Sequence, residues 1–163
     1  MKNNNNSFNS SFFKVGCQWD DLTNVILNAS SIYSSGYAID NVKSEGGNPW
    51  HSISLGEQWI TFQFPSDVSL AGFRTRSPTS WDGSHFNEFS FQYSTDGGSK
   101  WTKFYEGNGS NLDCCKWETV IFGTKHIPAS NFQLSMKNNH GYKPLNTYFV
   151  IAQLELLNCE SNN

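Results

Sequence analysis

The sequence predicts an all-β domain of the sandwich or barrel class, and three observations support this fold. Roughly seven or eight short segments alternate apolar and polar residues with the period of two expected of half-buried strands. Clusters of Gly, Asn, Asp and Ser, the usual turn residues, separate these segments. No segment sustains the period of 3.6 that marks an amphipathic helix. We therefore expect one folded domain over residues 15–160, between a disordered Asn/Ser-rich lead (1–14) and a short tail (161–163).

The first half of the chain contains one clear strand and one weaker strand. Residues 25–27, Val-Ile-Leu, suggest a short strand or the core of a turn, and residues 29–49 form a long connection rich in Ser, Gly, Asn and Tyr. From Trp59 to Phe64 apolar residues alternate with Thr and Gln, which predicts a strand. Pro65 is expected to end it, because proline cannot donate to a sheet ladder.

The most informative stretch is a predicted hairpin in the middle of the chain. A strand at residues 71–76 precedes it and alternates Ala, Phe and Thr against Gly and two Arg. The first strand of the hairpin, residues 89–94, alternates three aromatic residues with Ser and Gln, Asp-Gly-Gly at 96–98 supplies the turn, and Trp101 begins the return strand. The remaining strands are expected at residues 101–105, 117–122, 132–137 and 148–157.

The loop SPTSWDGSHF (77–86) between the strands 71–76 and 89–94 is a candidate binding loop, because its aromatic and polar groups are costly to expose without a partner. Its candidate ligand residues are Trp81, Asp82 and His85. Trp81 can form a platform for a pyranose or a wedge into a lipid interface, or it packs back on the barrel. His85 can hydrogen-bond an axial hydroxyl, or it is a structural histidine at a strand start. Asp82 and His85 beside a Ser look like hydrolase parts. However, the sequence has no Gly-x-Ser-x-Gly turn and no evident pair of buried carboxylates, so we expect no enzyme.

The composition narrows the class of partner. Charged residues make up 15% of the chain, below the usual quarter, and Asn, Ser, Thr and Gly supply the polarity, which is typical of extracellular proteins. The net charge of −3 argues against nucleic-acid binding. The longest apolar run, Tyr148 to Ala152, is far shorter than the roughly 20 residues needed to cross a bilayer. Residues 1–13 have no signal-peptide core, so a secreted chain would begin after its signal or inside a longer protein.

The four cysteines divide into an outer pair and a neighbouring pair. Cys17 and Cys159 lie near opposite ends, and a bridge between them would close the folded part of the chain. Cys114 and Cys115 are adjacent, and three interpretations stay open: a vicinal disulfide, two reduced thiols, or links to a partner. The spacing matches no zinc pattern.

Six short motifs follow one another along the chain: Ala38-x-Asp40, Trp50-His51-Ser52, Gln58-Trp59-Ile60, the strand from Gly72 to Arg76, Tyr93-Ser94-Thr95-Asp96-Gly97 followed by Trp101, and Leu154-Glu155-Leu156-Leu157-Asn158-Cys159. In this order they resemble the discoidin family, the coagulation factor V/VIII type C domains, also called galactose-binding-like domains. The resemblance covers Cys17 to Cys159. It implies an eight-stranded jelly-roll β-sandwich, often with bridged terminal cysteines. It also implies a non-enzymatic module that binds glycans, anionic phospholipid or proteins through loops at one end.

The resemblance also implies site residues. Arg76 stands where the family's sugar-binding arginine lies, and a guanidinium can donate to two vicinal hydroxyls. The alternative is a surface arginine that pairs with Asp82 or Glu88. His51 resembles the histidine that follows the Trp in several sugar-binding members. Three further candidates belong to the loop before the last strand: Asn139, His140 and Tyr142.

A structural calcium ion is also implied by the glycan-binding branch of the family, although no cofactor is required for binding. Asp40 and a Glu in the final strand would hold the ion, and Glu155 is the Glu present here. The sequence departs from the family at Asn41, where a glycine is usual, and Gln153 is the alternative occupant of the acidic position.

Together these features predict an extracellular, secreted or cell-surface lectin-like module that binds a galactose-like glycan through Arg76 and Trp81. Anionic phospholipid is the second expected ligand, and a cell-surface protein in an adhesion complex is the third. Self-association and flanking domains are both compatible with the sequence, because a shallow single site binds weakly and gains from several copies.

Overall fold

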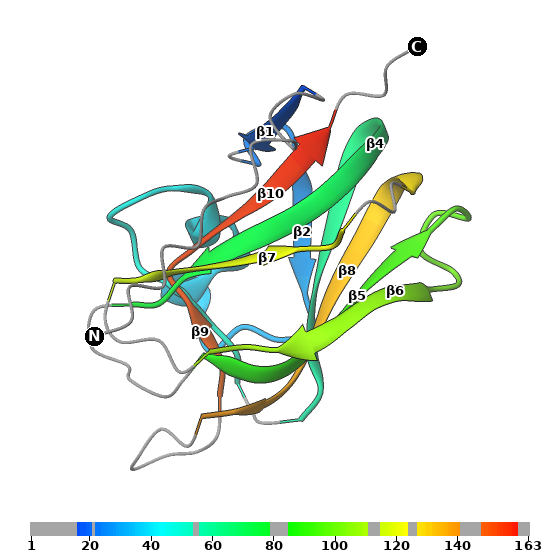
Figure 1. The fold of residues 1–163 in the computed structure, drawn as a ribbon. Helices are drawn as coiled ribbons and strands as arrows, with labels where there is room; N and C mark the ends of the chain where they lie inside the picture. The colour runs from blue at the N-terminus through cyan, green and yellow to red at the C-terminus, as the bar shows by residue number, and fades with distance from the viewer. Residues whose placement is uncertain are drawn as a thin grey trace, which may run out of the picture.

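The computed structural model describes residues 16–20, 22–53, 56–78, 85–110, 115–123, 127–140 and 148–159 (Figure 1). The predicted lead (1–14) and tail (161–163) lie outside these residues. Within the described part, no helix is long and apolar enough to cross a membrane.

The described residues form an antiparallel β fold with two short 3-10 helices, as the sequence predicts. The elements, in chain order, are β1 (Cys17–Asp20), β2 (Ile26–Ala29), η2 (Ser35–Tyr37), η3 (Ile39–Lys43), β3 (Trp50–His51), β4 (Gln58–Arg76), β5 (Phe86–Ser94), β6 (Thr102–Asn108), β7 (Trp117–Ile121), β8 (Pro128–Asn139), β9 (Val150–Ile151) and β10 (Gln153–Cys159). The main sheet has the order β1-β10-β4-β8-β5-β6, with β2 and β7 also paired to β4, and β3 pairs with β9 separately.

Strand β4 joins the two layers of the sandwich. Its first arm pairs with β2 and β8, and its second arm pairs with β7 and β10. Figure 1 shows the two arms folded back on each other. The prediction that Pro65 ends a strand is wrong, because β4 continues through it. The register with β8 shifts between Gln63 and Val68, so the proline stands where the ladder is already interrupted and its missing N–H costs no pairing.

Aromatic rings from both layers fill the space between them. Phe73 lies on the second arm of β4, is fully buried and stacks on Phe91 of β5 at 5.5 Å between ring centroids. Phe62, on the first arm, lies 5.9 Å from Phe91 on the same layer. Thr75 is also 0% exposed, in agreement with the inward face predicted for Phe73 and Thr75. Ala71, predicted on the same face, instead packs in a separate cluster with Leu157 and the two disulfide cysteines, because the register between β4 and β10 shifts at this point. The core therefore follows from period-two alternation.

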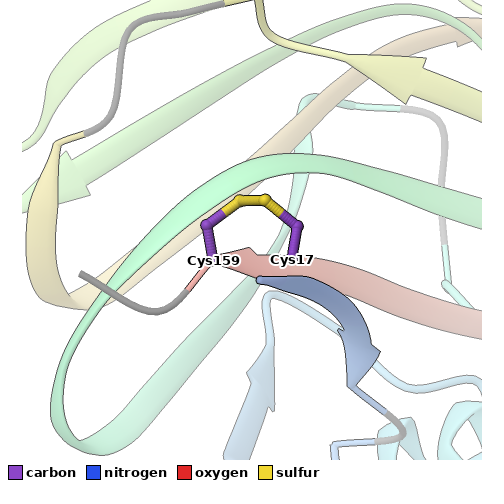
Figure 2. Close-up of a disulfide and its surroundings, with 2 residues drawn as sticks. All are labelled: Cys17 and Cys159. Carbon is purple, nitrogen blue, oxygen red and sulfur yellow. A yellow bond between two sulfur atoms is a disulfide. The ribbon is translucent and has the colours of Figure 1, made fainter. Parts of the chain in front are cut away.

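The outer cysteines form a disulfide. Strands β1 and β10 pair antiparallel with Cys17 opposite Cys159, and Figure 2 shows the bond between their sulfur atoms. This confirms the bridge that the sequence predicts. Cys115 has a free thiol, whereas Cys114 lies outside the described residues.

Candidate functional site

Most of the predicted ligand residues that the structure describes lie at one end of the sandwich. Because β4 folds back, Gln58 and Arg76 at its two ends share this end. Arg76 is opposite Gln153 at the start of β10, whereas Cys159 at the other end of β10 is opposite Ser69. The disulfide and Arg76 are therefore at opposite ends of the domain.

Arg76 is held by a carboxylate that the sequence did not indicate. Its Nη1 atom donates to Glu45 Oε1 at 2.6 Å, and the two side chains are 26% and 73% exposed. Glu88, one of the predicted partners, instead accepts a hydrogen bond from Asn138. The other, Asp82, lies outside the described residues. Glu45 is distant in sequence and lies in an aperiodic connection, so no pattern could have found it.

An open cavity of about 240 Å³ adjoins this ion pair. Its lining includes Glu45, Gly46, Gly47, Arg76, Ser77 and Gln153. The wall combines a guanidinium, a carboxylate, an amide and a hydroxyl, and two glycines leave room beside them. Such a wall offers both donors and acceptors to a polar ligand.

His51 is covered by tyrosines. Its ring is 2% exposed and lies 4.0 Å from Tyr148, 4.7 Å from Tyr33 and 5.5 Å from Tyr37, measured between ring centroids. Burial lowers the pKa of His51, and Nδ1 lies 2.6 Å from the Ser52 carbonyl. Tyr33 is 57% exposed. In this structure a ligand at this point would therefore meet a tyrosine before the imidazole. Sequence reasoning missed these tyrosines, because their segments meet His51 through contacts between residues far apart in sequence, such as the Tyr33 N–H donating to the His51 carbonyl and the pairing of β3 with β9.

His85 is an interior residue in this structure. Its ring is 2% exposed, Nε2 lies 2.7 Å from Thr75 Oγ1, and Nδ1 lies 3.5 Å from Glu118 Oε2. With a neutral ring, the Thr75 hydroxyl donates to Nε2 and the N–H at Nδ1 faces Glu118. Hydroxyl, imidazole and carboxylate follow one another as in hydrolases. Thr75 is 0% exposed, so no substrate can reach the hydroxyl. The three residues Thr75, His85 and Glu118 therefore have a structural role, because they join β4, β7 and the start of β5 in the interior.

Burial determines the charge states of His85 and Glu118. Burial, and secondarily the charge of His140, lowers the pKa of His85 to about 3, and burial raises the pKa of Glu118. Nδ1 of His85 and Oε2 of Glu118 are buried with no hydrogen-bond partner among the described residues. The 3.5 Å separation is too long for a strong bond. We therefore assign His85 as neutral near pH 7.

This assignment predicts acid sensitivity. Unfolded His85 binds a proton near its ordinary pKa of 6.5, whereas the folded ring does so only at about 3. The unfolded state then holds more protons, so the free energy of unfolding should fall as the pH is lowered from about 6.5 toward 3, partly offset by Glu118. Urea unfolding across this pH range measures the slope. His85→Gln should flatten it, and an unchanged slope in that variant would contradict the assignment.

Asn139 and His140 hold backbone near the same end. Asn139 Nδ2 donates to the Tyr148 carbonyl at 3.0 Å, and His140 Nε2 lies 3.0 Å from the Gly109 carbonyl. A Cβ atom at Gly109 would lie 2.2 Å from the Phe86 carbonyl oxygen, so the close approach of these two backbone segments requires a glycine at position 109. Three other predicted ligand residues, Trp81, Asp82 and Tyr142, lie outside the described residues and stay predictions.

Each of the two predicted calcium ligands has a basic side chain beside it. Asp40 Oδ1 lies 2.8 Å from Lys43 Nζ, and Glu155 Oε2 accepts a 2.7 Å hydrogen bond from Arg74 Nε. The Arg74 guanidinium lies 4.6 Å from the ring centroids of two tryptophans, Trp19 and Trp117. Each carboxylate therefore already pairs with a basic residue. Over the described residues, no group of three or more His, Cys, Asp or Glu could hold a metal ion. This pair does not fit calcium.

Solved structures with the same fold include several carbohydrate-binding modules. The third family 32 module of a family 31 glycoside hydrolase from Clostridium perfringens has a TM-score of 0.73 at 17% identity, covering 91% of this chain and 97% of that one. The Clostridium perfringens NanJ module in complex with galactose has a TM-score of 0.71 at 14% identity, with coverages of 86% and 98%. An F5/8 type C domain from Bacteroides fragilis has a TM-score of 0.71 at 15% identity, with coverages of 90% and 99%.

These likenesses are below 25% identity and establish the fold alone. A search of curated protein sequences finds no match. The family itself comes from the sequence, because the F5/8 type C domain model matches residues 26–150. This match covers most of the chain and agrees with the predicted resemblance and with the observed β-sandwich. The chain belongs to the F5/8 type C domain family.

Proposed function

We propose that this protein is a non-catalytic carbohydrate-binding module that recognises a galactose-like glycan at the end of the sandwich where both ends of β4 lie. The observation that carries the proposal is the Arg76–Glu45 pair beside an open cavity at this end, whose wall offers both polar groups and apolar surface. Similar folds occur in modules solved with galactose and with GalNAc-β-1,3-galactose, which supports a glycan as the ligand class.

The chemistry of the pair suits a sugar. A guanidinium is a rigid fork of N–H donors, and the carboxylate beside it is an acceptor, so neighbouring hydroxyls can both donate and accept here. Glu45 also fixes the guanidinium through its 2.6 Å contact, which reduces the conformational entropy lost on binding. A neutral polyhydroxyl ligand is bound by polar groups held in fixed positions, and it does not require a site with a net charge.

The exposed Tyr33 ring can add an apolar contact. One part of it packs on His51, and 57% of the residue remains exposed. Galactose has an apolar face that stacks on aromatic rings, and Tyr has both such a face and a polar hydroxyl. Trp81 is the second proposed platform, from its place in the 77–86 loop.

Arg76→Ala is expected to weaken glycan binding about 10- to 100-fold, since hydrogen bonds to a charged group contribute about 1.5–3 kcal/mol. A glycan array identifies the ligand, and isothermal titration calorimetry measures the change. Arg76→Lys should recover little, because lysine lacks the fork. Lys103→Ala is the matched control, because its ammonium pairs with exposed Glu106 on β6 and should leave affinity unchanged.

Phospholipid vesicles separate this proposal from its main alternative. Sedimentation with phosphatidylserine vesicles, run beside the glycan array, should show no binding. Vesicle binding without a glycan signal would contradict the carbohydrate proposal and favour membrane attachment. Binding only to a protein partner, with neither glycan nor vesicles, would favour an adhesion role.

We also propose an extracellular location. The Cys17–Cys159 disulfide supports it, because such bonds persist in oxidising compartments. The mass of the natural protein, measured intact without reductant, should show the outer pair oxidised. Two reduced thiols at these positions would contradict an extracellular location.

A further inference from the structure

Lys43, at the end of η3, folds its side chain back toward the turn before β2. Its Nζ atom lies 2.8 Å from Asp40 Oδ1 and donates a 2.8 Å hydrogen bond to the Val25 carbonyl. The side chain is 23% exposed, so most of it is buried. A lysine ammonium is a compact cation with three donors, and here a carboxylate oxygen and a carbonyl oxygen hold it.

The carbonyl that receives Lys43 belongs to a tight turn. Leu22 has a positive φ of 64°, and its N–H donates to Asp20 Oδ1 at 2.7 Å. The Val25 N–H then donates to the Leu22 carbonyl at 3.0 Å. Leu22 and Val25 are both buried, so the turn presents the Val25 carbonyl to Lys43 from a fixed position.

We propose that the Lys43 ammonium is a built-in substitute for a divalent cation in the connection that follows β2. Carboxylate and carbonyl oxygens are the ligands that calcium prefers. Here the Asp40 carboxylate and the Val25 carbonyl bind the Lys43 ammonium. A calcium ion at Asp40 would have to displace Lys43 or bind beside its positive charge. Glu155, the other predicted ligand, is already neutralised by Arg74.

The contact links the turn before β2 to the candidate glycan site. Lys43 joins η3 to residues 22–25, and η3 buries Ile39 and Val42 in the core. The chain then continues to Glu45, which holds Arg76. An internal cation thus fixes the approach to the site without a bound metal. Thermal stability can test this proposal whether or not the protein binds a glycan.

The test is thermal unfolding in excess EDTA and in millimolar calcium chloride. The unaltered protein should have the same Tm in both. Lys43→Met should lower the Tm in EDTA by about 2–4 °C, the shift expected for the loss of one favourable contact. Calcium should restore part of this loss, because Asp40 and the Val25 carbonyl are then without the ammonium. Lys103→Met, which removes an exposed i,i+3 ion pair, should show neither effect.

Three results would overturn the proposal. The first is a Tm of the unaltered protein that rises with calcium. The second is a Lys43→Met variant as stable in EDTA as the unaltered protein. The third is a destabilised Lys43→Met variant whose Tm is the same in calcium and in EDTA, since Lys43 would then be a structural contact only. If that variant does not fold, the comparison of the unaltered protein in EDTA and calcium decides alone.

Discussion

Replacing both Cys17 and Cys159 by serine should lower the free energy of unfolding by about 4 to 5 kcal/mol. The bond joins residues 142 apart in sequence, so it removes a large loop-closure entropy from the unfolded chain. Both cysteines are buried, at 7% and 2% exposure, so the serines would also place hydroxyls in an apolar cluster with Ala71 and Leu157. Urea unfolding at pH 7 measures the difference.

Cys115→Ser is the matched control for this experiment. Its thiol is free and half-buried, so its replacement should change the unfolding free energy little. Reductant should destabilise the unaltered protein and leave the double serine variant unaffected. Equal unfolding free energies for the double variant and the unaltered protein would show that the bond does not constrain the unfolded chain as proposed.

Phe73→Ala should destabilise the fold by about 3–5 kcal/mol, the range for removing a buried phenylalanine. The ring is 0% exposed and lies within 6.3 Å, centroid to centroid, of four other phenylalanine rings: Phe86, Phe89, Phe91 and Phe122. It is at the contact between the two layers, so neighbouring strands cannot readily close the cavity. Urea unfolding measures this loss, and Phe73→Leu should cost clearly less because it fills most of the volume.

An outer-face residue gives the comparison for Phe73. Lys137→Ala removes a side chain that is 57% exposed on β8 and pairs loosely with Glu57. Such a change should alter stability by less than about 1 kcal/mol. A Phe73→Ala variant no less stable than Lys137→Ala would mean that Phe73 does not join the layers.

Strand positions were predictable because alternation in sequence reports directly on burial. Phe73 and Thr75 on β4, and Phe89 and Phe91 on β5, are buried as predicted, and Gly97 and Gly98 adopt the positive φ of the predicted turn. The continuity of β4 through Pro65 was not predictable, because it depends on a register shift with a partner strand far away in sequence. Rules based on neighbouring residues detect the proline but contain no information about the interrupted hydrogen-bond ladder with β8.

The candidate site was only partly predictable. Arg76 could be identified from its strand position, but its partner Glu45 belongs to a segment without periodicity. The tyrosines over His51 come from two segments far apart in sequence, Tyr33 and Tyr37 from the connection 29–49 and Tyr148 from the start of the last segment, and these segments meet only in the fold. His85 carried two interpretations in the sequence, and its contacts with Thr75 and Glu118 depend on pairing between β4 and β7.

The covalent link between β1 and β10 also determines how the domain bears force. A pull applied to chain segments before Cys17 and after Cys159 would pass through the sulfur–sulfur bond, because the two cysteines are directly opposite each other at paired strands. The sheets between them would carry almost none of that load. Arg76 and its cavity, at the far end of β10, would keep their shape while the chain on either side is under tension.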